Sequence, residues 1–320
     1  MRPPLSYLRI SVTSRCNLRC VHCQPERGEA GADVLSREEI VRFVRLAVEC
    51  GIEKVRVTGG EPLVRPDIVE IVRDLAALPG LRQLGLTTNG CRLPELAAPL
   101  REAGLRRINI GLSALDPAVY ERVTRGARAG PLASSRHPAL AGLRAAVDAG
   151  FDPVKVNVVV MKGVNDDEIA SLALLARDDA IEVRFIEYMP FAAEPGMRER
   201  YFVPAETVLA RLRELGEVEP AAGPRGPASA QRYRIRGFKG TVGLIAPHSA
   251  PFCGACNRIR LTAEGRLRAC LIDGGEQDVL PLIRRGLDRA TMARLLAEAA
   301  AKKPAVHTGA FCGQMHRIGG

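Results

Sequence analysis

Residues 8–188 alternate short β-branched runs with amphipathic segments of helical length. Residues 8–12 and 54–58 have the composition of strands, and residues 36–50 and 66–78 have helical spacing. Ser36, followed three residues later by Glu39, forms a capping box that marks a helix start. The same order recurs until six strand and helix units have passed. The pattern predicts an α/β fold with a parallel sheet and helices outside it.

Composition limits the class of protein further. The chain has 320 residues, of which 47% are hydrophobic and 26% charged, enough for one large domain and a smaller one. No apolar run approaches the ~20 residues that span a membrane, and the first ten residues lack the layout of a signal peptide. The nine cysteines are mostly clustered, which favours metal binding in a reducing compartment. We therefore expect a cytoplasmic protein without a membrane anchor.

The formal net charge of +10 indicates an anionic partner or simply an arginine-rich composition. Nucleic acid is disfavoured, because only 4% of residues are aromatic and no basic tract stands apart as an arm. A phosphorylated small molecule held by several arginines explains the same excess of charge.

Two breaks interrupt the pattern. Residues 126–138 are rich in Gly, Ser and Pro and predict a mobile loop, and residues 219–230 predict a domain boundary. We expect domains at 1–218 and 219–320. In the second domain the sequence predicts two strands, a cysteine-bearing turn, a hairpin turning at Glu264 and Gly265, and then one long helix.

Polar residues stand at or near the end of each predicted strand. Because strand ends in such sheets carry the chemistry, these positions become candidate site residues. They are Arg9, Thr58, Thr87, Asn109, Asn157 and Glu187.

Two sets of three cysteines flank this region. The first triad, Cys16, Cys20 and Cys23, directly follows the first strand, and the second triad is Cys253, Cys256 and Cys270. A closed tetrahedral zinc site takes four ligands, so three thiolates favour a cube-shaped iron–sulfur cluster with one iron left open. The alternative for the first triad is a zinc site with His22 as the fourth ligand.

The segment LRISVTSRCNLRC, followed by Gly59-Gly60-Glu61-Pro62, resembles the radical S-adenosylmethionine (SAM) superfamily. The whole chain resembles the GTP 3',8-cyclase family of molybdenum cofactor biosynthesis. The segments VRVTGGEPLVR, LGLTTNG, AGLRRINIGL, VKVNVVV, EVRFIEYM, FCGACNRIRLTAEGRLRACL and the terminal Gly-Gly carry this resemblance. It implies an incomplete (β/α)6 barrel resembling triosephosphate isomerase and a smaller C-terminal α+β domain with a second cluster.

The resemblance also implies chemistry, cofactors and partners. Two [4Fe-4S] clusters and SAM would yield a 5'-deoxyadenosyl radical that removes the ribose 3'-hydrogen of GTP. An external low-potential electron donor, cyclic pyranopterin monophosphate synthase as the downstream enzyme, and a homodimer are implied as well.

Site residues follow from the same resemblance, position by position. SAM would contact Gly60, Met189 and the backbone at His22. GTP would contact Arg9, Arg56, Thr87, Lys155, Arg258 and Arg260. Gly319 and Gly320 would form a catalytic tail that reaches into the site.

Several positions depart from the family pattern. Gln24 replaces a methionine, His22 replaces an aromatic residue, and Gly111 and Ser113 stand where serine and aspartate are typical. The loop at 126–138 is also longer than usual. Among the remaining cysteines, Cys50 and Cys91 are expected to be buried and free, and Cys312 is not assigned to a cluster.

Two alternatives remain open. A related enzyme with the same clusters could act on a different nucleotide, which the departures at Gly111 and Ser113 motivate. A non-catalytic metal-binding scaffold could instead contact nucleic acid through its positive charge.

Overall fold

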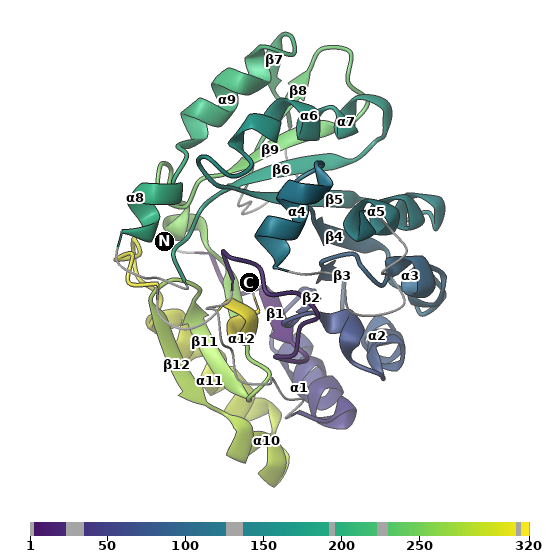
Figure 1. The fold of residues 1–320 in the computed structure, drawn as a ribbon. Coiled ribbons are helices and arrows are strands. Elements are labelled where there is room, and N and C mark those ends of the chain that lie inside the picture. Colours follow the sequence, from purple (N-terminus) through teal and green to yellow (C-terminus); the bar gives the residue numbers. More distant parts are fainter. Residues whose placement is uncertain are drawn as a thin grey trace.

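Six parallel strands form the centre of the computed structural model, which describes residues 3–23, 35–125, 137–191, 196–222, 230–311 and 315–319. The strands pair in sequence order (Figure 1). They are β1 (Tyr7–Ser11), β2 (Lys54–Thr58), β3 (Gln83–Thr88), β4 (Arg107–Gly111), β5 (Val154–Val160) and β6 (Glu182–Glu187). The predicted parallel sheet is confirmed.

Helices follow the strands and cover the outer face of the curved sheet (Figure 1). They are α1 (Arg37–Glu49), α2 (Ile68–Ala76), α3 (Leu93–Glu102), α4 (Pro117–Thr124), α5 (Pro138–Asp148), α6 (Ile169–Ala173) and α7 (Leu175–Asp178), with short 3-10 turns η1 (Pro62–Val64) and η3 (Asp166–Glu168). Apolar side chains of the strands and helices pack into one large core between these layers.

Local sequence explains how α1 begins. The Ser36 hydroxyl accepts a hydrogen bond from the Glu39 backbone at 3.2 Å, and the Glu39 carboxylate accepts one from the Ser36 backbone at 2.8 Å. The predicted capping box is therefore confirmed, and it satisfies two backbone donors that a helix N-terminus leaves unpaired.

The chain after β6 extends the sheet at both edges. Beyond β6 lie β9 (Thr241–Ile245), β8 (Gln231–Ile235) and β7 (Val218–Pro220), and beyond β1 lie β10 (Arg258–Leu261), β11 (Arg266–Cys270) and β12 (Gly274–Asp278). The helices α8 (Met197–Tyr201) and α9 (Ala205–Arg213) precede β7, and η4 (Cys253–Ala255) precedes β10. The division into 1–218 and 219–320 thus falls within one twelve-stranded sheet and stays a proposal.

The six central strands form an incomplete barrel, because β12 and β7 end the sheet without pairing with each other. Figure 1 shows the sheet curving around the C-terminal segment, which carries α12 (Met315–Ile318). None of the helices in the described part of the chain is both long enough and apolar enough to cross a bilayer.

The hairpin predicted at Glu264 and Gly265 is confirmed as β10 and β11. The single long helix predicted after it is wrong. The structure has a third strand, β12, and two helices, α10 (Leu280–Gly286) and α11 (Arg289–Ala301). Gly286, with φ of +96°, ends α10, and the Asp288 side chain caps the start of α11 at the Thr291 backbone.

Candidate active site

A cavity of about 330 Å³ opens on the inner face of the sheet. Period-two alternation places its lining, because residues two apart on a strand face the same side. Tyr7 and Arg9 line it from β1, and Arg258 and Arg260 line it from β10. Nine of its lining side chains are Lys or Arg, and none is Asp or Glu: Arg9, Lys54, Arg56, Arg107, Lys155, Arg184, Arg232, Arg258 and Arg260. The cavity therefore suits an anion.

Three arginines lie side by side across neighbouring strands. Arg9 pairs in register with Arg260 on β10 and with Arg56 on β2. Adjacent strands are about 4.8 Å apart, and like charges opposite each other are destabilising. Arg56 and Arg260 are only 6% and 5% exposed, so solvent screens this repulsion little. We refer to Arg260, Arg9 and Arg56 as the arginine row; an anionic ligand would relieve its repulsion.

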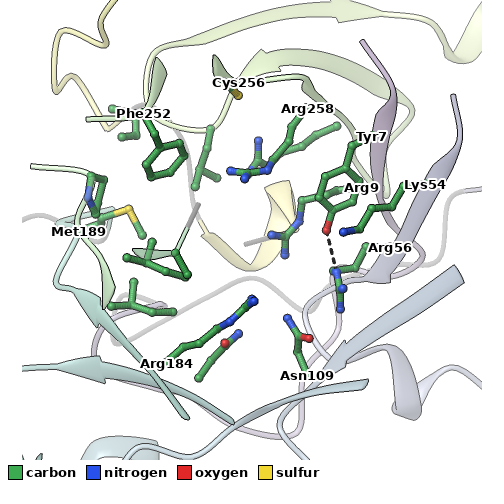
Figure 2. Close-up of a pocket in the computed structure, with 18 of the residues that line it drawn as sticks. Tyr7, Arg9, Lys54, Arg56, Asn109, Arg184, Met189, Phe252, Cys256 and Arg258 are labelled. Carbon is green, nitrogen blue, oxygen red and sulfur yellow. Dashed lines mark hydrogen bonds between the residues drawn. The ribbon is translucent and has the colours of Figure 1, made fainter. Parts of the chain in front are cut away.

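Burial, neighbouring charges and hydrogen bonds all act on these arginines. Burial, together with Arg9 and Arg258, lowers the pKa of Arg260 to about 9. The Arg56 guanidinium donates to the Tyr7 hydroxyl at 2.7 Å and to the Leu86 carbonyl at 3.2 Å. Figure 2 shows this pair beside Lys54, across the cavity from Met189.

A glycine makes room for Arg56. A Cβ atom at Gly85 on β3 would lie 3.1 Å from Arg56 Nη2. The absence of a side chain at Gly85 therefore lets the guanidinium lie across β3 and reach the Leu86 carbonyl.

One carboxylate balances the cations on the other side of the cavity. Glu182 lies 2.7 Å from Lys155, 2.7 Å from Arg184 and 3.5 Å from Arg232. Burial, followed by the neighbouring Arg184, lowers the pKa of Lys155 to about 8 despite this ion pair. Glu182 thus offsets part of the positive charge on this side of the cavity.

The second triad lines the same cavity. Cys253 and Cys256 lie on and just after η4, and Cys270 ends β11. Burial raises the pKa of Cys256, but Lys303, Arg258 and Arg260 outweigh it and lower the pKa overall. A lowered pKa favours the thiolate, which is the form that ligates iron.

The first triad lies on the loop after β1 and does not line the cavity. Burial raises the pKa of Cys23 to about 12 and also raises that of Cys16 and Cys20. Burial lowers the pKa of His22 to about 4, so its imidazole is neutral.

The donor sets fit iron–sulfur clusters. Nowhere in the described ranges do three His, Cys, Asp or Glu side chains converge closely enough to hold a single metal ion. In a cube-shaped cluster each thiolate binds a different iron, so the cysteine sulfur atoms do not converge on one point. Three thiols on one loop can each bind one iron of such a cluster.

The Gly59-Gly60-Glu61-Pro62 segment packs directly on the loop of the first triad. The Gly60 backbone donates to the Thr13 carbonyl at 2.7 Å, and the Glu61 backbone donates to the Arg15 carbonyl at 2.8 Å. A Cβ atom at Gly60 would lie 2.3 Å from the Arg15 carbonyl oxygen, so only glycine fits without moving the backbone.

Glu61 ties this segment to β3. Its carboxylate accepts hydrogen bonds from the Leu63 backbone at 2.9 Å, the Thr88 hydroxyl at 2.7 Å and the Asn89 backbone at 2.6 Å. The loop of the first triad, the glycine segment and the end of β3 therefore form one connected unit.

The C-terminal segment reaches the carboxyl ends of the strands. Gly319 is buried with φ of +69°, and a Cβ atom there would lie 2.4 Å from Thr58 Oγ1 and 3.3 Å from Ser11 Cβ. Met315, in the same segment, lines the cavity. Gly320 and Cys312 lie outside the described residues.

The structure places most predicted substrate contacts in one cavity. Arg9, Arg56, Lys155, Arg258 and Arg260 line it, as does Met189. Thr87 does not line it, although its hydroxyl is buried without a hydrogen-bond partner. The roles of all these residues stay predictions.

The sequence did not lead us to predict several residues that line the cavity. Tyr7 and Lys54 each stand two positions before a predicted arginine on the same strand, so period-two alternation could have found them. The same rule could have found Arg107, which stands two positions before Asn109, whereas Arg184 and Arg232 had no comparable signal. Of the cysteines expected to be buried, Cys91 is 2% exposed, but the expectation was wrong for Cys50, which is only partly buried where it caps α1.

The comparisons with known proteins agree with this geometry. The family model described as the radical SAM superfamily matches residues 10–176, and the one described as Molybdenum Cofactor Synthesis C matches residues 181–309. The Streptococcus suis protein SuiB, solved bound to S-adenosylmethionine, shares the fold with a TM-score of 0.58 at 15% identity, covering 92% of this chain and 68% of that one. The chain belongs to the radical SAM superfamily.

Similarity to curated relatives identifies the family within this superfamily. The GTP 3',8-cyclase of Pelotomaculum thermopropionicum is 44% identical, covering 95% of this chain and 92% of the relative. That of Geobacter sulfurreducens is 43% identical, covering 98% and 94%. The human molybdenum cofactor biosynthesis protein 1 is 41% identical, covering 96% of this chain and 47% of that protein. The chain belongs to the GTP 3',8-cyclase family.

Proposed function

We propose that the chain is a radical SAM enzyme that converts GTP into (8S)-3',8-cyclo-7,8-dihydroguanosine 5'-triphosphate, the first step of molybdenum cofactor biosynthesis. One observation carries the proposal: the arginine row shares a single cavity with the second triad. A row of buried cations and a second cysteine site in one cavity are what a nucleoside triphosphate bound at a cluster requires.

The first triad would hold the [4Fe-4S] cluster that binds SAM. Gly60 supports this role, because its backbone packs directly on the loop that carries the triad. Met189 and the backbone at His22 would complete the SAM site. When bound, the cluster and SAM supply a 5'-deoxyadenosyl radical able to remove a ribose hydrogen.

The second triad would hold a second [4Fe-4S] cluster, and its open iron would take the guanine. The arginine row, with Arg258 and Lys155, would bind the triphosphate, since guanidinium forks match phosphate oxygens. Thr87 would contact the nucleotide from β3. A volume of about 330 Å³ falls within the range of about 300–1,000 Å³ that small-molecule sites have.

Two parts of this arrangement would hold the substrate. The basic side chains fix the triphosphate, the second triad fixes the base, and the ribose is held between them. Gly319 and Gly320 would line the site beside the ends of β1 and β2, which the packing of Gly319 on Thr58 and Ser11 supports.

The family resemblance supports further partners. We propose an external low-potential electron donor, cyclic pyranopterin monophosphate synthase as the next enzyme, a homodimeric assembly and a cytoplasmic location. Nucleic acid is not among the proposed partners, because the basic side chains gather in a cavity too small for it.

Substrate choice tests the proposal. The reduced, reconstituted protein is incubated with SAM and either GTP, ATP or CTP, and nucleotide products are identified by mass spectrometry. We expect a cyclised product from GTP alone. Cleavage of SAM with a product from another nucleotide, and none from GTP, would show that the proposed reaction is wrong.

The arginine row provides the matched variant. Loss of a charged hydrogen bond costs about 1.5–3 kcal/mol, so Arg260→Ala raises the KM for GTP about 10- to 100-fold. Arg236→Ala is the control, because Arg236 is exposed and pairs with Glu217 at the surface. Equal KM values for the two variants contradict the assignment of the cavity.

A further inference from the structure

Lys303 is a buried lysine that lies behind the second triad and does not line the cavity. The residue is only 8% exposed. It follows α11, which packs against β11, so the end of this helix brings the ammonium group to the backbone of β10 and β11. A buried charge is costly unless it is paired and hydrogen-bonded, so the partners of Lys303 are informative.

Two of those partners are backbone carbonyl groups. Lys303 Nζ donates to the Arg258 carbonyl at 2.7 Å and to the Ala269 carbonyl at 2.8 Å. It also hydrogen bonds to the Cys256 side chain. Ala269 directly precedes Cys270, so one ammonium group connects the backbone beside two ligands of the second triad.

A second buried cation binds the backbone at the end of β11. Arg268 is 2% exposed and donates to the Cys270 carbonyl at 2.8 Å and to the Leu271 carbonyl at 2.8 Å. Its charge is paired with the Glu276 carboxylate. The charges that act most strongly on Lys303 are instead those of Cys256, Arg260 and Cys270.

We infer that Lys303 is a positioning residue for the second cluster, which fixes Cys256 relative to Cys270 and raises the reduction potential of the cluster they hold. The inference rests on the proposed second cluster. Hydrogen bonds to ligand sulfur and the local charge set the potential of iron–sulfur clusters. Reduction adds a negative charge, so a nearby ammonium group stabilises the reduced form.

The test measures the midpoint potentials of both clusters in the reconstituted full chain by redox titration followed by electron paramagnetic resonance. The second cluster is identified as the one whose signal changes when GTP is added, and the first as the one that responds to SAM. The variants are Lys303→Met, which removes the charge, Lys303→Arg, which keeps it, and Lys302→Met, which removes the exposed neighbouring charge.

We expect Lys303→Met to lower the midpoint potential of the second cluster and to leave that of the first unchanged. Lys303→Arg and Lys302→Met keep both potentials near those of the unaltered protein. A Lys303→Met protein with unaltered iron content and an unaltered second potential overturns the inference.

Loss of the second cluster is equally decisive. If Lys303→Met keeps only about four of about eight iron atoms per chain while Lys303→Arg keeps all, the positioning role is supported. If both variants lose the cluster but retain native circular dichroism, the inference is overturned, because a cationic donor does not restore the site. An unaltered protein whose signals ignore GTP refutes the proposed function instead, whatever the Lys303 variants do.

Discussion

Tyr7 lies among cations that determine its ionisation. Burial raises the pKa of its phenol, but Arg56, Arg9, Lys54 and Arg258 outweigh burial and lower the pKa to about 7. The phenolate therefore forms as the pH rises through about 7 in the nucleotide-free protein. A bound triphosphate attracts the same cations and repels the phenolate.

Nucleotide affinity should depend on pH for this reason. GTP binding takes up a proton on Tyr7 above pH 7, so the Kd of the unaltered protein rises with pH, by at most about tenfold per pH unit. Tyr7→Phe makes this dependence less steep, because no phenolate forms at this position and only the loss of protons from Lys155 and Arg260 remains. Equilibrium binding from pH 6 to 9 checks the prediction, and parallel profiles for the two proteins contradict it.

Glu61 provides a prediction about stability. Glu61→Ala leaves the Leu63, Thr88 and Asn89 donors without their acceptor, so the free energy of unfolding falls by about 1–3 kcal/mol. Glu53→Ala is the control, because the pair of Glu53 with Arg82 is exposed and contributes about 0–1 kcal/mol. Denaturant unfolding of the cluster-free proteins measures both, and equal losses would show that Glu61 does not join the segments.

Residue identities could be predicted from sequence only where a local rule applied. The cysteine spacing and the candidate residue Arg9 follow from the sequence pattern, whereas Arg56 follows from the family resemblance. The cavity contains both arginines. Lys303 could not be found in this way. Its importance comes from two carbonyl groups that are 45 and 34 residues away in the sequence.

At the scale of elements, the C-terminal segment provides the sharpest test. Gly319→Ala places a Cβ atom against Thr58 Oγ1, so the segment shifts away from the strand ends. We expect cyclised product to fall at least tenfold while SAM binding is retained. Deletion of Gly319 and Gly320 should abolish the product altogether.

Gly309→Ala is the matched control for backbone strain. Gly309 has φ of +81°, similar to Gly319, but a Cβ atom there would meet nothing closer than 3.8 Å. Both variants therefore carry the strain of a left-handed alanine, and only Gly319→Ala adds a clash. Equal turnover in the two variants, or unchanged turnover in the deletion, would refute a role for the tail.

Helices and strands with complete local signals could be predicted, and those without them could not. The capping box at Ser36 and the hairpin turn at Gly265 occur where the sequence indicates. The region after Cys270 reads as one helix because its apolar spacing is continuous, yet Gly286 and the capping Asp288 divide it. The pairing of β12 with β11 is tertiary and has no local signal.

At the scale of the whole molecule, the two ends of the chain build one sheet. β10 pairs with β1, and β9 pairs with β6, so the later third of the chain covers both edges of the central strands. These pairings join distant segments, and sequence periodicity cannot reveal them. The proposed division at residue 218 therefore falls within one continuous sheet.

This continuity predicts how the chain tolerates division. A fragment ending at residue 218 exposes the edges of β1 and β6, and unpaired edges promote aggregation. We expect the fragment to be insoluble or to unfold without a cooperative transition, whereas the full cluster-free chain unfolds in one. Differential scanning calorimetry distinguishes these outcomes. A stable, monomeric fragment would show that residue 218 separates independent domains.

Iron content and turnover, measured together on one anaerobic preparation, test whether two clusters in one chain couple SAM cleavage to GTP cyclisation. We predict about eight iron atoms per chain. With reductant and SAM, we predict 5'-deoxyadenosine that forms only when GTP is present and in proportion to the cyclised nucleotide. A folded protein with about four iron atoms, or one that cleaves SAM without forming that nucleotide, would contradict these predictions.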